Sequence, residues 1–102
     1  MASRLKLHEE LIEVLGENRC FFQPPESVKL VYPCIVYNVS SGETTFADDV
    51  PYSFKKRYTV TIIGRDPDTT LVERMAMRFP SCIYERRYVA DNLYHDVFAL
   101  YY

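Results

Sequence analysis

The chain has 102 residues, 48% of them apolar and 25% charged, which is the composition of one globular domain and excludes a disordered protein. Its net charge of −2 argues against a general nucleic-acid-binding protein, because such proteins carry a clear basic excess. No apolar run reaches membrane-spanning length and no signal-peptide pattern opens the chain. We therefore expect a soluble protein, made in a cytoplasm and without a membrane partner.

Two segments carry the periodicity of amphipathic helices. The first spans residues 3–15, where Ser3 can cap the start and Gly16 suits the end. The second follows Arg65, where Asp66 or Asp68 can cap it, and Pro80 stops it. The apolar faces are Leu7, Leu11, Val14 and Leu15 in the first helix, and Leu71, Val72, Met75, Ala76 and Phe79 in the second.

Two runs between these helices alternate as strands do. They span residues 34–39 and 55–63, and the short run 19–22 is a further strand candidate. In the first run Ile35, Tyr37 and Val39 share one face, and Cys34, Val36 and Asn38 share the other.

The connection 40–54 between those strands is far longer than the roughly two to five residues of a usual hairpin loop. It carries Phe46, Val50, Tyr52 and Phe54, which are costly to expose unless something covers them. The segment either folds back over its own domain or reaches a neighbouring subunit. We favour the second, because a domain of this size has few faces left to cover.

The chain ends in a segment rich in aromatic and β-branched residues, although chain ends are usually the least ordered part of a domain. Asp91 and Asn92 separate two strand-like runs and tolerate the positive φ of a tight turn. A two-residue turn there sets Ala90 opposite Leu93, and Arg87 opposite Asp96. The final residues Tyr101 and Tyr102 require a surface to pack on.

These elements predict an α+β fold: a mainly antiparallel sheet of about four to five strands with two amphipathic helices packed on it. The strands follow one another with few crossover helices, which favours antiparallel pairing. We expect one domain over residues 1–102, with a long loop or hairpin extension at about 41–54.

The sequence offers little chemistry, so we assign no catalytic, cofactor-binding or metal-binding residue and expect no enzyme. His95 and Asp96 are adjacent on a strand and point to opposite faces, so they do not form an oriented dyad. Asp48 and Asp49 lack the spacing of a calcium loop and are interpreted as solvated acids. Cys20, Cys34 and Cys82 are spaced too widely for a zinc site and are expected to be small, buried, reduced residues in a reducing compartment.

Four stretches taken in order resemble the tail terminator, or tail completion, proteins of long-tailed phages. They are YPCIVY at 32–37, KKRYTVT at 55–61, RDPD at 65–68 and RYVADNLYH at 87–95, and the similarity runs from about Phe22 to the end. These stretches form a pattern of strands and turns, not a catalytic signature.

The resemblance implies an α+β subunit that assembles into a hexameric ring in the virion, at the end of the tail facing the head. Such a ring caps the tail tube, ends tail elongation and provides the surface that joins the head connector. The implied partners are other copies of the chain, the tail tube protein and the connector or neck protein. DNA passes through the ring without specific binding.

Our own interpretation of the residues, and not the resemblance, supplies the expected subunit or partner interface. It consists of Phe46, Asp48, Asp49, Val50, Tyr52, Phe54, Tyr101 and Tyr102. Two other functions stay open: a head-side neck or connector protein of the same assembly, and a small ligand-binding α/β domain or weak enzyme.

Overall fold

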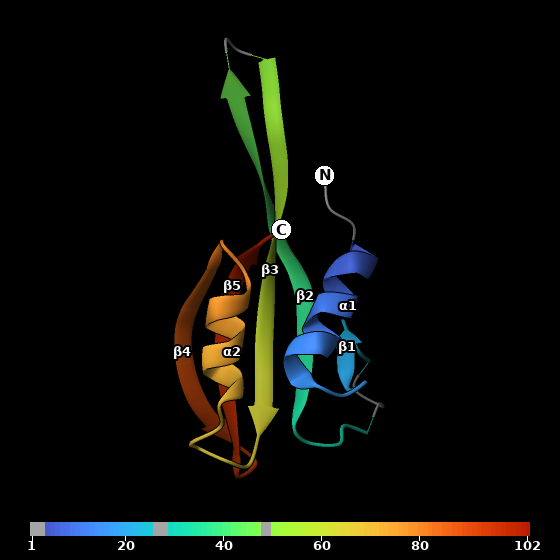
Figure 1. Ribbon diagram of the computed structural model, residues 1–102, viewed down its shortest axis with the longest axis vertical. Coiled ribbons are helices and arrows are strands. Elements are labelled where there is room, and N and C mark those ends of the chain that lie inside the picture. The colour runs from blue at the N-terminus through green and yellow to red at the C-terminus, as the bar shows by residue number, and fades with distance from the viewer. Residues whose placement is uncertain (1–3, 26–28, 48–49) are drawn as a thin grey trace.

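The computed structural model describes residues 4–25, 29–47 and 50–102, and for 41–47 and 50–55 it describes the backbone. Two helices and five strands follow one another along the chain (Figure 1). They are α1 (Arg4–Leu15), β1 (Cys20–Phe22), β2 (Cys34–Ala47), β3 (Val50–Gly64), α2 (Leu71–Arg78), β4 (Cys82–Ala90) and β5 (Leu93–Tyr101).

The strands form one sheet in the order β1-β2-β3-β5-β4. Every neighbouring pair is antiparallel except β1 and β2, which are parallel. Both helices lie against the same face of this sheet (Figure 1). The predicted α+β class, with a mainly antiparallel sheet and two helices packed on it, is therefore confirmed.

The main core lies between the helices and the sheet. Its most buried members are Leu7 and Leu11 of α1, Met75 of α2, and Ile35, Tyr37, Tyr58, Val60, Ile62, Phe98 and Leu100 of the sheet. A smaller cluster on the opposite face joins Cys34, Ile63 and Leu93, with Leu30 and Tyr32 packed against it. The predicted apolar faces hold, apart from Ala76, which is exposed on α2.

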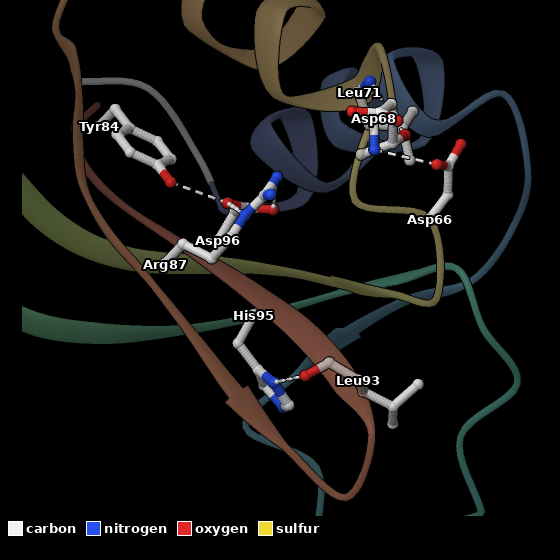
Figure 2. A network of polar contacts seen from close by, with 9 residues as sticks. Asp66, Asp68, Leu71, Tyr84, Arg87, Leu93, His95 and Asp96 are labelled. Carbon is white, nitrogen blue, oxygen red and sulfur yellow. Dashed lines mark hydrogen bonds and ion pairs between the residues drawn. The ribbon is translucent and has the colours of Figure 1, made fainter.

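The start of α2 differs from the prediction. Thr70 occupies the N-cap position, without a side-chain capping bond, and the helix begins at Leu71. The Asp66 carboxylate accepts a hydrogen bond at 2.9 Å from the Asp68 backbone N–H (Figure 2). The Asp66 carboxylate therefore stabilises a local turn before the helix and does not cap α2. The prediction of Asp66 or Asp68 as the cap was wrong. The predicted cap of α1, Ser3, lies outside the described residues.

The connection for which a long loop or a hairpin extension was expected is a hairpin extension of β2 and β3 over the described residues 41–47 and 50–54. The strands were expected to end at Val39 and to restart at Lys55, but they continue to Ala47 and restart at Val50. The extra length forms an arm, defined here as residues 41–47 and 50–55, that projects beyond the body (Figure 1). The molecule is accordingly elongated, with extents of 50 × 27 × 23 Å.

The terminal hairpin has the predicted turn and register. Asp91 and Asn92 adopt φ values of 52° and 61°, as a tight two-residue turn requires. Ala90 pairs with Leu93 and Arg87 pairs with Asp96. The last strand, β5, lies between β3 and β4, so the chain end is an interior part of the sheet.

The last residue, Tyr102, packs on its own subunit. Its hydroxyl donates a hydrogen bond to the Glu10 carboxylate of α1, and its ring meets the Phe79 ring edge-on at 6.2 Å. Burial, together with this carboxylate, raises the pKa of Tyr102 to about 12. The folded protein therefore holds the phenolic proton more tightly than the unfolded chain, in which a tyrosine titrates near pH 10.

This difference predicts an alkaline loss of stability that depends on Tyr102. The contribution of the neutral hydroxyl is complete below about pH 10 and is lost as the pH rises through about 12. We expect the unfolding free energies of wild type and Tyr102→Phe, measured in urea, to differ most below pH 10 and to converge above it. A difference in unfolding free energy between the two proteins that stays constant from pH 8 to pH 12 would contradict the raised pKa of Tyr102.

Candidate interaction surfaces

The outermost strand, β4, exposes an unusual amount of apolar surface. It pairs with β5 alone among the described strands, so its outer edge presents backbone N–H and C=O groups to solvent. Four apolar or aromatic side chains on it are well exposed: Ile83 (58%), Tyr84 (43%), Tyr88 (41%) and Val89 (61%). An exposed edge of this kind is a ready template for pairing with another chain.

Two features of β4 limit indiscriminate pairing. The register with β5 shifts between Tyr84 and Arg86, which marks a bulge at Glu85. Charged side chains lie along the same stretch, where Glu85 meets Arg57 of β3 at 3.2 Å and Arg86 lies over the Tyr88 ring at 5.6 Å. Bulges and charges are common protections of natural edge strands. These features of β4 therefore disfavour indiscriminate edge-to-edge pairing.

A buried polar network anchors β4 to the body. Asp96 of β5 is 1% exposed and accepts hydrogen bonds from Arg87 Nε at 2.8 Å, from Arg87 Nη2 at 3.3 Å and from the Tyr84 hydroxyl at 2.8 Å. Figure 2 shows both β4 side chains converging on this carboxylate. The hydrogen bond to Asp96 raises the pKa of Arg87. Because the buried charge is paired, the network holds the edge strand in place.

A pocket of about 330 Å³ opens beside this network, with Tyr32, Arg65, Asp66 and Tyr94 in its wall next to Asp96. It mixes aromatic and charged groups, as small-molecule sites do. However, both oxygens of the Asp96 carboxylate are already engaged by Arg87 and Tyr84. The Asp96 carboxylate in the pocket wall therefore stabilises the fold, and its hydrogen-bonding capacity is largely used before any ligand binds.

The histidines do not assemble into catalytic arrangements within the described part of the chain. His95 stacks on Tyr88 at 4.6 Å, on the face of the sheet opposite the Asp96 network, so the predicted separation of His95 from Asp96 is confirmed. His8 Nδ1 lies 2.6 Å from the Tyr37 hydroxyl. No group of three metal-ligating side chains gathers among the described residues.

The three cysteines are free thiols; Cys20 and Cys34 are buried as expected, whereas Cys82 is only partly buried. Burial raises the pKa of Cys20 to about 12 and the pKa values of Cys34 and Cys82 to about 11. Each thiol is therefore protonated near neutral pH and a poor nucleophile.

The residues predicted for the interface fall in two places. Phe46, Val50, Tyr52 and Phe54 lie in the strands of the arm, while Asp48 and Asp49 lie outside the described residues. Tyr101 pairs with Arg57 at the end of β5, and Tyr102 packs against α1 and α2 of its own subunit, as described above. The structure thus places the described arm residues along the projecting hairpin and the two terminal tyrosines at its base, beside Lys56 and Arg57.

Sequence reasoning did not identify which strand lies at the exposed edge of the sheet. Residues 82–90 of β4 were predicted as a strand of the terminal hairpin, but that pattern alone does not say which of the two strands lies at the edge. One signal was available, because Ile83, Tyr88 and Val89 place apolar groups on both faces of a strand that also carries Arg86 and Arg87.

Together these features define an α+β protein with a projecting β-arm and an open sheet edge. No family model matches the chain, and no curated protein matches it significantly. Neither helix that the structure describes is both long and apolar enough to cross a bilayer.

Proposed function

We propose that this chain is a structural virion protein that forms a ring capping the phage tail tube. The ring ends tail elongation and provides the surface that joins the head connector. The observation that carries the proposal is that one small subunit has two unlike free surfaces, the arm and the β4 edge. The four stretches that resemble tail terminator proteins support the same assignment.

Unlike surfaces are what a ring needs. In a closed ring each subunit meets the next through a heterologous interface, where one patch contacts a different patch. The arm projects away from the body, while β4 runs along the body's side (Figure 1). A subunit of this shape can reach one neighbour with its arm and receive the other on its edge. A net charge of −2 also suits a channel through which DNA slides without being held.

Two other functions keep a specific motivation. A neck or connector protein on the head side of the same assembly needs the same kind of heterologous interface. A small ligand-binding domain is favoured by the pocket of about 330 Å³ beside Asp96. A ligand that fills this pocket would raise the melting temperature of the isolated protein.

The decisive experiment combines imaging with a phage that lacks the protein. We expect purified protein, mixed with purified tail tubes, to form a ring at one tube end by electron microscopy. We also expect particles made without it to carry tails longer than normal. Tails of normal length that fail to join heads would indicate the neck function instead. If no ring forms on tubes or in solution at any concentration, the proposal is wrong.

A further inference from the structure

We propose that the β2 edge of one subunit's arm pairs with the β4 edge of the next subunit, so that a single sheet continues from copy to copy. This inference rests on the proposed ring only for the closed arrangement of the copies. The contact itself is argued from the unpaired strand edges, their lengths, their charges and their positions.

The described residues leave three long strand edges without a partner. β4 is free along its outer side, since it pairs with β5 alone. In the arm, β1 pairs with β2 only over residues 35–37, and β5 pairs with β3 only from Arg57 onward. Both sides of the arm therefore present unpaired backbone groups, which gain hydrogen bonds when another strand is added.

The lengths of the two edges match. β4 has nine residues, and the arm segment of β2 covers residues 41–47. At about 3.4 Å per residue these correspond to roughly 30 Å and 24 Å of strand. The arm can therefore pair along most of β4 without overhanging it.

The composition of the arm favours its β2 side over its β3 side. The β3 side contains Pro51, which lacks a backbone N–H, and Lys55, which would approach the arginines of β4. The β2 side, residues 41–47, contains neither proline nor a basic residue, and its single charged residue is Glu43. Only the β2 edge offers a continuous row of donors and acceptors with an acidic charge.

β4 carries the complementary charge. Glu85 is engaged by Arg57 and Arg87 by Asp96, both inside the subunit. Arg86 forms no ion pair with the described residues and lies over the Tyr88 ring at 5.6 Å. Its guanidinium is thus the cation of β4 available to Glu43 of an incoming strand. A symmetric β4–β4 pair centred on Arg86 would instead bring two arginines together, which disfavours that alternative.

The pairing is intermolecular. The arm extends beyond one end of the body, away from the β4 of its own subunit (Figure 1). Each copy therefore donates an arm and accepts one, and this heterologous contact propagates until the ring closes.

A charge-swap series tests the contact. Glu43→Arg and Arg86→Glu each turn an attractive cross-strand pair into a repulsive one, and we expect each to weaken self-association about tenfold at every interface. The double variant restores the pair with reversed sign and should return to within about threefold of wild type. An equal mixture of the two single variants should also associate, with the two variants alternating, because each arm then meets an oppositely charged edge on the other variant.

Self-association is measured by sedimentation velocity and native mass spectrometry over a wide concentration range. Glu9→Arg and Lys29→Glu reverse exposed charges elsewhere in the body and serve as matched controls, expected to associate like wild type. Circular dichroism confirms that each variant is folded. Additive losses in the double variant, without rescue, would overturn the contact between Glu43 and Arg86.

Disulfide trapping gives an independent test. We expect oxidation of a mixture of Glu43→Cys and Arg86→Cys proteins to yield a cross-linked heterodimer, in solution and in assembled tails. The native thiols should contribute few cross-links. Wild-type protein oxidised in the same way is the control for them. Efficient cross-linking of Arg86→Cys with itself would overturn the inference in favour of a symmetric edge pair. An absence of arm-to-edge cross-links in both solution and tails would also overturn it.

The outcomes separate this inference from the proposed function. Rings on tail tubes without arm-to-edge cross-links would leave the proposed function standing and remove the sheet-extension contact. Arm-to-edge cross-links in a protein that never joins tail tubes would leave the sheet-extension contact standing and remove the proposed function.

Discussion

Replacing Phe98 with alanine is expected to lower the free energy of unfolding by about 3–5 kcal/mol, the usual cost of deleting a buried phenylalanine. Phe98 is fully buried in β5, four residues before the chain end. Its ring meets the Tyr84 ring of β4 edge-on at 5.2 Å and belongs to the core beneath the helices. The alanine variant leaves a cavity at the centre of the sheet, where the surrounding strands cannot collapse freely.

Urea denaturation at 25 °C measures this loss. Val89→Ala on the neighbouring strand is the control, because Val89 is well exposed, and it should change stability by less than about 0.5 kcal/mol. Phe98→Leu keeps most of the volume and should cost less than about 1.5 kcal/mol. If Phe98→Ala is as stable as Val89→Ala, the last strand does not occupy the interior of the sheet.

Local patterns were sufficient to predict the elements whose signals are local. The helix over 3–15 follows from the spacing of its leucines, and the terminal hairpin follows from Asp91-Asn92 and the pairing of Arg87 with Asp96. These signals act over a few residues, because turn chemistry and side-chain periodicity are fixed by the backbone geometry of each element.

The strand pairing within the arm was not predicted, although a hairpin extension at about 41–54 was one of the two alternatives. The first strand was expected to end at Val39, where the apolar alternation of residues 34–39 ends. Alternation marks a strand with one face on a core, whereas a projecting two-stranded ladder has no core beneath it. Its backbone pairing, from Gly42 with Lys56 to Ala47 with Val50, needs no apolar face.

The order of strands was harder to predict. A hairpin can join a sheet through either of its strands, and the charged residues at 85–87 are the signal in residues 82–101 that distinguishes the two choices. The last strand joins β3 because its buried face, with Phe98 and Leu100, completes the core under the helices. Consequently β4 lies at the edge of the sheet. The β4 edge, one of the two candidate interaction surfaces, is therefore set by tertiary packing.

Removing the arm is expected to abolish assembly while leaving the subunit folded. Gly42 pairs with Lys56, so an Asn-Gly turn in place of residues 43–55 closes the shortened hairpin with a favourable two-residue loop. Lys56 is kept because its carbonyl accepts the Tyr102 backbone N–H at 3.0 Å. Every core residue that the structure describes is kept in this variant, so we expect the melting temperature to stay within about 5 °C of wild type.

The armless subunit should also act as a dominant inhibitor of wild-type assembly. It retains its β4 edge and accepts the arm of one neighbour, but it has no arm to offer to the next. In a heterologous ring every interface is needed for closure, so one armless copy leaves the ring open. We therefore expect a minor fraction of armless protein to reduce the number of closed rings on tail tubes disproportionately, as counted by electron microscopy. Simple dilution, in which rings fall only in proportion to the wild-type protein, would show that the arm does not link neighbouring copies.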